Sequence, residues 1–265
     1  MRIVQITDSH VTATGTLWKG ELDTAERLAR AAAAVNRIGA DLVVHTGDLV
    51  EDGAMTQGPA EYTAAAQALA GLEPPLRLLP GNHDGRAAMR GAFPGQDWHG
   101  APFLQFSDHA EGLRLIGLDT VEEGRVGGRL CAERIDWLAK CLDDGPTLIF
   151  LHHPPCPMGL PFMDGFGFEG GEALAGVLTG ANVLGLACGH VHADVDVHWA
   201  GTTVSAAEAV SVQISPDTAP LATFTPETKL TMTVEPLRLR VFDWMDGVLS
   251  VKTVMGEDSG EVLRV

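Results

Sequence analysis

Histidine, aspartate and asparagine residues gather in five short blocks, and each block follows a short apolar run within a residue or two. The blocks are Asp8-Ser9-His10, Gly47-Asp48, Gly81-Asn82-His83-Asp84, His152-His153 and Gly189-His190-Val191-His192. Imidazole nitrogens and carboxylate oxygens are ligands that suit Zn, Mn, Fe or Co. Seven candidate ligands exceed the need of one tetrahedral ion, and they suit two ions about 3.5–4 Å apart that share a carboxylate.

The spacing inside the blocks favours convergent side chains. Residues two apart in an extended backbone point to the same side, which applies to Asp8 with His10 and to His190 with His192. Glycines next to Asp48 and His190 permit tight turns and close backbone approach. Because ligands of open α/β sheets bind at the carboxyl ends of the strands, we expect the blocks to meet at one edge of a sheet.

The apolar runs before the blocks predict buried strands, and helical spacing between them predicts helices. The expected strands are Ile3–Ile6, Leu42–Val44, Leu76–Leu79, Leu113–Leu118, Leu148–Leu151 and Val183–Ala187. The expected helices are Leu22–Ile38, which should stop at Gly39, then Glu61–Leu69, Glu133–Leu142 and Gly171–Leu178. Strands that alternate with helices indicate βαβ units and an α/β fold.

The pattern changes from about Asp194 onward. Short β-like runs at Thr231–Val234, Leu237–Phe242 and Val248–Val254 predict that residues 193–265 are mostly antiparallel strands, packed beside the α/β core. No linker is evident, so residues 1–265 are expected to form a single domain, with the metal motifs in residues 1–192. The segment Pro154–Gly171 is too long for a tight turn, and long loops inside a compact domain are often functional.

Composition excludes several classes of protein. The formal net charge of −17 over 265 residues repels long polyanions, so a nucleic-acid polymer is not an expected partner. No apolar run approaches the ~20 residues that cross a bilayer, so no membrane partner is expected. The sequence enters a strand at once, which leaves no room for a signal peptide, and we expect a cytoplasmic protein. Its four cysteines are expected to be free thiols.

A charge balance narrows the substrate. Two divalent ions bring four positive charges, and Asp8 and Asp48 cancel two of them. A bridging hydroxide and a phosphodiester monoanion would neutralise the remaining two. The sequence therefore mildly favours a phosphodiester over a phosphomonoester dianion.

The order D-x-H, GD, GNHD, H and GHxH resembles the calcineurin-like metallophosphoesterase superfamily, and more narrowly its bacterial cyclic-nucleotide and glycerophosphodiester phosphodiesterases. The resemblance covers residues 8–192. It implies a four-layer αββα sandwich with a dinuclear metal site at the carboxyl ends of the strands. It also implies metal-dependent hydrolysis of small phosphodiesters by a hydroxide that bridges the two ions.

The resemblance assigns roles residue by residue. The first metal would take Asp8, His10 and His192, the second would take Asn82, His152 and His190, and Asp48 would bridge both. His83 would lie over the phosphate and assist catalysis, so His83, Asp48 and Asn82 are the candidate catalytic residues. His153 would support the site or be structural.

One position departs from the family. Relatives of this branch usually carry a histidine where this chain has Val212, which puts a cyclic-nucleotide substrate in question. A phosphomonoesterase on the same site and a metal-free scaffold of the same fold remain alternatives. A homo-oligomer also stays open, because relatives commonly associate through the C-terminal region.

Four further residues are expected to lie outside the reaction. His45 should be a core histidine, Glu51 should be solvated, and Arg86 should lie on an exposed helix face. Asp84 is expected to orient its neighbours.

Overall fold

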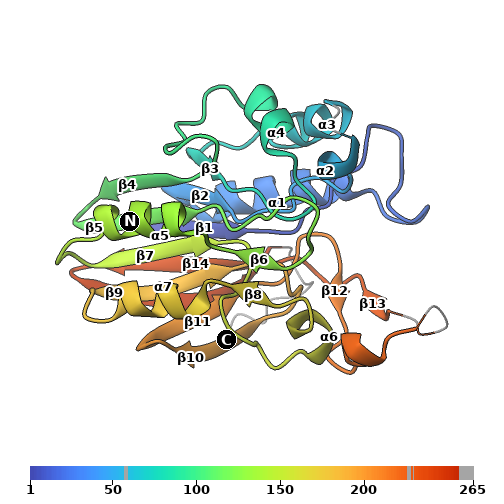
Figure 1. Ribbon diagram of the computed structural model, residues 1–265. Coiled ribbons are helices and arrows are strands. Elements are labelled where there is room, and N and C mark those ends of the chain that lie inside the picture. The colour runs from blue at the N-terminus through green and yellow to red at the C-terminus, as the bar shows by residue number, and fades with distance from the viewer. Residues whose placement is uncertain (57–58, 226–227, 229, 257–265) are drawn as a thin grey trace, which may run out of the picture.

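The protein is built from two β-sheets stacked face to face, with helices on their outer faces (Figure 1). This computed structural model describes residues 1–56, 59–225, 228 and 230–256. Within that part of the chain, no helix has both the length and the apolar character needed to span a membrane.

The first sheet has the strand order β15-β14-β1-β2-β3. Its strands are β1 (Arg2–Ile6), β2 (Leu42–His45), β3 (Leu76–Leu78), β14 (Arg238–Met245) and β15 (Val248–Met255). Strands β1, β2 and β3 run parallel, whereas β14 pairs antiparallel with both β1 and β15.

The second sheet has the order β10-β11-β9-β7-β5-β4. Its strands are β4 (Phe106–Ala110), β5 (Leu113–Leu118), β7 (Thr147–Leu151), β9 (Val183–Cys188), β10 (Val195–Trp199) and β11 (Thr202–Ala206). The four central strands are parallel, and β4 and β10 close the edges antiparallel.

Helices cover the outer face of each sheet. On the first sheet lie α1 (Thr24–Ile38), α3 (Ala60–Ala68) and α4 (Arg86–Ala92), with the short α2 (Gly53–Thr56) before them in the chain. On the second lie α5 (Ala132–Cys141), α6 (Pro161–Asp164) and α7 (Gly171–Leu178). Short pieces complete the fold: β6 (Gly128–Arg129) with β8 (Phe168–Glu169), β12 (Gln213–Ile214) with β13 (Met232–Thr233), and a 3₁₀ turn at Leu221–Thr223.

Three apolar cores hold the layers together. One lies between the two sheets, where Ile3 and Val44 pack in the same cluster as Phe150 and Phe242, and one lies under each helix layer. Because both faces of the central strands are covered, these strands are largely apolar, with single polar residues such as Gln5 in β1 and Arg114 in β5. The expected four-layer αββα architecture is confirmed.

Helix α1 shows how local sequence sets an element's limits. The Asp23 carboxylate accepts a hydrogen bond from the backbone N–H of Glu26 and caps the first turn. Gly39 ends the helix with φ +72°, the left-handed conformation that glycine adopts without steric cost.

The C-terminal strands are present, but their position differs from expectation. Most of them do not pack beside the α/β core, because β14 lies next to β1 inside the first sheet and β11 extends the second sheet beside β9, whereas β12 and β13 form a separate two-stranded sheet. The side chain of Phe242 on β14 fills part of the core between the sheets. Burial of this side chain favours the position of β14 within the first sheet.

Candidate metal centre

The five motif blocks lie at the carboxyl ends of five parallel strands. Asp8 and His10 follow β1, Asp48 follows β2, Asn82 and His83 follow β3, His152 follows β7, and His190 and His192 follow β9. Backbone bonds join these ends within each sheet: His10 N–H donates to the Asp48 carbonyl at 3.0 Å, and Gly189 N–H donates to the His152 carbonyl at 3.0 Å. Between the sheets, the backbone N–H of His190 donates to the Asp8 carboxylate at 3.0 Å.

Five of the seven predicted ligands have left-handed backbones, which non-glycine residues seldom adopt. The φ angles are +52° at Asp8, +46° at His10, +52° at Asp48, +70° at His190 and +52° at His192. Each costs of order 1 kcal/mol or more and persists only where the surroundings enforce it. The strain indicates that these turns are shaped for function.

Two glycines permit the close approach of the strand ends. A Cβ on Gly81 would collide with the Asp48 carboxylate, and a Cβ on Gly189 would collide with the Thr7 hydroxyl. Both positions therefore require glycine.

The first group of convergent side chains is Asp8, His10 and His192, whose ligand atoms all lie within 4.8 Å of one another. The Nε2 atoms of His10 and His192 face each other at 3.2 Å. The Nε2 atom of His192 lies 3.3 Å from Oδ1 of Asp8. Three lone-pair donors pointing at one spot form a site that fits a cation.

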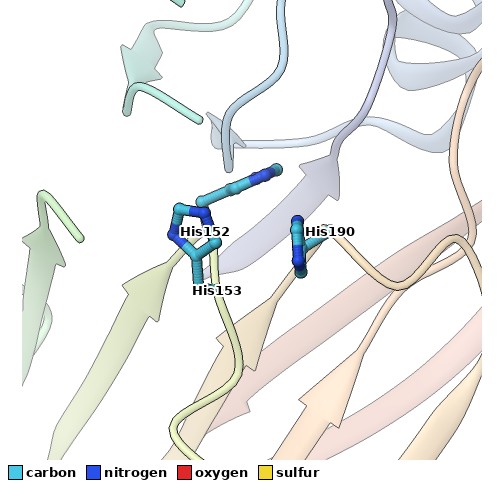
Figure 2. A group of neighbouring side chains, drawn as sticks. All are labelled: His152, His153 and His190. Carbon is cyan, nitrogen blue, oxygen red and sulfur yellow. The ribbon is translucent and has the colours of Figure 1, made fainter. Parts of the chain in front are cut away.

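The second group gathers around His152. Its Nε2 atom lies 3.2 Å from Oδ1 of Asn82 and 3.2 Å from Oδ2 of Asp48. The ring of His190 has its centroid 5.2 Å from that of His152. Figure 2 shows His152 and His153 at the end of β7 and His190 after β9.

Asp48 lies between the two groups. Its Oδ2 atom is 3.2 Å from Nε2 of His152 in the second group and 3.7 Å from Nε2 of His10 in the first. Its other oxygen, Oδ1, accepts a 2.8 Å hydrogen bond from the backbone N–H of His83. One carboxylate is thus within reach of both candidate ion sites.

Backbone carbonyls fix the orientation of two ligand imidazoles. Nδ1 of His152 donates to the Thr46 carbonyl at 2.8 Å, and Nδ1 of His192 donates to the Val212 carbonyl at 2.6 Å. Because a carbonyl only accepts, each Nδ1 carries a proton, which leaves Nε2 as the nitrogen that would bind a metal. Val212 therefore supports the predicted ligand His192 through its backbone carbonyl, and this contact does not depend on the Val212 side chain.

The buried carboxylates rely on the histidines for compensating charge. Burial alone raises the pKa of Asp8, but His192 and His152 outweigh burial and hold that pKa below its usual range. The same balance holds for Asp48, whose pKa is lowered by His152 and His83. Burial depresses the pKa of His152, yet Asp48 raises it to about 9. Within the described part of the chain, the salt bridges of Asp8 and Asp48 go to histidines alone, so the donor set suits cations.

Glu51 belongs to the site, and the prediction that it is solvated is wrong. Its Oε2 atom accepts a 2.7 Å hydrogen bond from Nδ1 of His10, and its backbone carbonyl accepts one of 2.6 Å from Nδ1 of His83. One residue therefore orients two imidazoles. Glu51 lies 41 positions from His10, so only the turn geometry after β2 reveals the contact.

Replacing Glu51 is expected to weaken the first ion site. Glu51→Ala removes the acceptor that holds Nδ1–H of His10, and such outer contacts are typically worth 10–100-fold in metal affinity. Glu51→Gln keeps an acceptor oxygen and should lose less. Titration of the metal-free protein with Mn²⁺ in a calorimeter measures the effect, with Asp52→Asn as a neighbouring carboxylate control. Equal affinities in Glu51→Ala and the wild type would refute this role.

His83 is more open than the aspartate and histidine ligands, with 36 % of its side chain exposed. Its ring meets that of His10 edge to face at 4.7 Å. Burial lowers the pKa of His83, but Asp48 and Glu51 overcome that and raise it. An imidazole at the rim of the centre whose protonated form is favoured is placed to meet an anion.

Three residues beside the centre have structural contacts. Asp84 accepts from the backbone N–H groups of Gly81 at 2.9 Å and Leu49 at 3.1 Å, and so ties the turn after β2 to the turn after β3. Nδ1 of His153 lies 2.8 Å from the Thr120 hydroxyl. The prediction that Arg86 lies on an exposed helix face is wrong.

Arg86 instead forms a two-pronged ion pair with the buried carboxylate of Asp119, at 2.7 and 2.8 Å. Asp119 directly follows β5, so helix α4 on the first sheet is linked to the second sheet. Sequence periodicity could not show this, because the partner is 33 residues away.

His45 is fully buried and neutral. Its Nδ1 accepts from the backbone N–H of Gly47 at 3.3 Å, so Nε2–H donates to the Ser9 hydroxyl at 2.8 Å. Burial lowers its pKa to about 4. The expectation of a core histidine agrees with this position.

The buried His45 is expected to make stability fall with acidity. Between an unfolded pKa of ~6.5 and the folded value of about 4, only the unfolded chain takes up this proton, so stability is lost as pH falls. From pH 7 to pH 5 the metal-free wild type should lose about 2 kcal/mol more free energy of unfolding than His45→Gln. Urea unfolding at both pH values measures the difference, and the other histidines are common to both proteins. Parallel losses would contradict the prediction.

Comparison with known proteins agrees with this geometry. The family model for calcineurin-like phosphoesterases matches residues 1–194. A probable glycerophosphodiester phosphodiesterase of Arcobacter nitrofigilis is 30% identical over 272 residues, covering 98% of this chain and 95% of that protein. A probable cyclic nucleotide phosphodiesterase of Rhodopseudomonas palustris is 37% identical over 210 residues, covering 76% of this chain and 75% of that one.

A solved structure shares the fold. The dimetal phosphatase from Danio rerio superimposes with a TM-score of 0.65 at 17% identity, over 97% of this chain and 99% of that one. The match to the family model and the full-length relative together settle the relationship. The chain belongs to the calcineurin-like phosphoesterase family and is a hydrolase.

Proposed function

We propose that this chain hydrolyses small phosphodiesters at a centre of two transition-metal ions drawn from Fe, Mn, Zn or Co. The observation that carries the proposal is the position of Asp48, whose Oδ2 is 3.2 Å from His152 and 3.7 Å from His10. A carboxylate shared by two nitrogen-rich groups is the arrangement that a pair of ions needs.

The ligand assignment follows the two groups. Asp8, His10 and His192 would hold the first ion, Asn82, His152 and His190 would hold the second, and Asp48 would contact both. When bound, the ions would supply positive charge to a phosphate and lower the pKa of a coordinated water. The protein holds the imidazoles of His10, His152 and His192 by their Nδ1 atoms, so that Nε2 is left for the metal and the cost of forming the site is lower.

His83 would act on the phosphate as a proton donor. Its side chain is at the rim, and its Nδ1 is held by the Glu51 carbonyl, so Nε2 is the nitrogen free to meet the substrate. Asp48 helps to keep the imidazole protonated. A proton delivered to the leaving oxygen would stabilise the alkoxide that forms as the P–O bond breaks.

The net charge of the chain argues for a small substrate. A formal charge of −17 opposes a polyanion, whereas two ions create a local positive centre that suits a single phosphate. The relatives named above support diesters, since one is named for glycerophosphodiesters and the other for cyclic nucleotides.

Metal removal and reconstitution test the proposal. Chelator-treated protein is expected to lose hydrolysis of bis(4-nitrophenyl) phosphate and to regain it with Mn²⁺ or Zn²⁺ as elemental analysis rises to two ions per chain. 4-Nitrophenyl phosphate, the matched monoester, should turn over more slowly. Faster turnover of the monoester would favour a phosphomonoesterase, and activity with chelator present would end the proposal.

A further inference from the structure

A cavity of about 230 Å³ opens directly beside the candidate second ion site. His190, one of that site's imidazoles, forms part of its wall, and the loop after His152 forms most of the rest. We propose that this cavity receives one ester group of the phosphodiester and selects a flat, apolar ring over a hydroxylated or charged group. The inference rests on the proposed function and specifies its substrate class.

The walls are mainly apolar. Pro154, Pro155, Pro157, Met163, Phe168 and Val191 line the cavity. Of the described residues that line it, none is a lysine or an arginine, so the cavity has no cation for a second anionic group.

Two polar side chains of the wall, Asp164 and His153, offer little to an entering hydroxyl. The carboxylate of Asp164 accepts from three backbone N–H groups: Met158 at 2.7 Å, Gly159 at 2.9 Å and Leu160 at 2.9 Å. Nδ1 of His153 is within hydrogen-bond distance of Thr120, and its Nε2, which has no hydrogen-bond partner among the described residues, is buried out of reach of solvent. A glycerol hydroxyl that enters would lose its water without a replacement, which costs about 1–3 kcal/mol for each group.

The size of the cavity suits a ring. An apolar cavity of ~150 Å³ is enough to bind benzene. The 230 Å³ here therefore admits a substituted aryl group or a ring system somewhat larger than benzene. Burial of ~100 Å² of apolar ring surface would contribute about 2.5 kcal/mol.

The loop that forms the cavity is already ordered. Met158, Leu160, Phe162 and Met163 are buried in the apolar core beneath the second sheet's helices. Asp164 closes the turn by its three backbone contacts. A wall that is formed in advance costs little ordering entropy when a ring binds.

Competition by methylphosphonate monoesters, which are monoanions, against bis(4-nitrophenyl) phosphate in initial-rate assays tests the subsite. We expect phenyl methylphosphonate to inhibit the Mn²⁺-loaded wild type at least 10-fold more strongly than glyceryl methylphosphonate. Cys156 lines the cavity, so Cys156→Phe should fill it, abolish this preference and leave glyceryl methylphosphonate unchanged. Cys156→Ser keeps the size and should keep the preference.

A second variant protects the test from a folding failure. Phe168→Ala removes a wall and should weaken phenyl methylphosphonate 3-fold or more at unchanged metal content. Equal inhibition of the wild type by the two compounds, or an intact preference in Cys156→Phe, would overturn the subsite. Loss of bis(4-nitrophenyl) phosphate hydrolysis in the wild type would instead overturn the proposed function.

Discussion

Asp48→Asn is expected to lower turnover of bis(4-nitrophenyl) phosphate at least ~10³-fold and to reduce the bound metal below two ions per chain. The change is isosteric, but it removes the one negative charge that both ion sites would share. Its Oδ2 lies 3.2 Å from Nε2 of His152 in the second group and 3.7 Å from Nε2 of His10 in the first. Loss of its charge is therefore expected to weaken both ion sites. Steady-state kinetics and elemental analysis on the same preparation measure both effects.

The control for Asp48→Asn is Asp52→Asn, which removes a carboxylate four positions along the same turn. It should retain both ions and near-normal turnover. A variant Asp48→Asn that kept two ions and full activity would show that the centre does not depend on a shared carboxylate.

Asn82→Ala and His83→Ala are both expected to lose activity, but with different effects on metal content, although the two residues are adjacent. Asn82 offers Oδ1 at 3.2 Å from Nε2 of His152, so its loss should empty the second ion site and lower turnover with it. His83→Ala should keep both ions and lose about 10²–10⁴-fold in turnover, the usual contribution of a positioned proton donor.

The pH profile separates the two variants further. Asp48 and Glu51 raise the pKa of His83 against the effect of burial, so the protonated form persists to higher pH than in a free histidine and is then lost as pH rises. The wild-type rate should therefore decline on the alkaline side, and His83→Ala should lack that decline. Equal metal loss in both variants would contradict the separate roles.

The sequence predicted the strand ends of the centre because each motif follows an apolar run that both sheet faces bury. It could not predict which strands pair, since alternation identifies a strand but not its neighbour. Val210 illustrates the limit. Val210, Val212 and Ile214 alternate with smaller or polar residues as strand residues do, but only Gln213–Ile214 is a strand.

The physical reason is that the backbone before Gln213 has another use. The N–H groups of Val210 and Ser211 donate to the carbonyls of Thr7 and Asp8, at 2.9 and 3.1 Å. They brace the turn that carries the first ligand instead of joining a ladder. The contacts of Glu51 and Arg86 could not be predicted for a similar reason, because each residue takes a partner more than 30 residues away.

The pairing of β14 with β1 bears on how the protein matures. Arg2 lies opposite Asp243, so the ribosome must add about 240 residues before the first strand gains this neighbour. At 5–20 residues per second, that delay is roughly 10–50 s. During this interval the turn holding Asp8 also lacks its brace from Ser211. Nascent chains are therefore expected to acquire their first ion only after translation has nearly finished, when the last strands arrive.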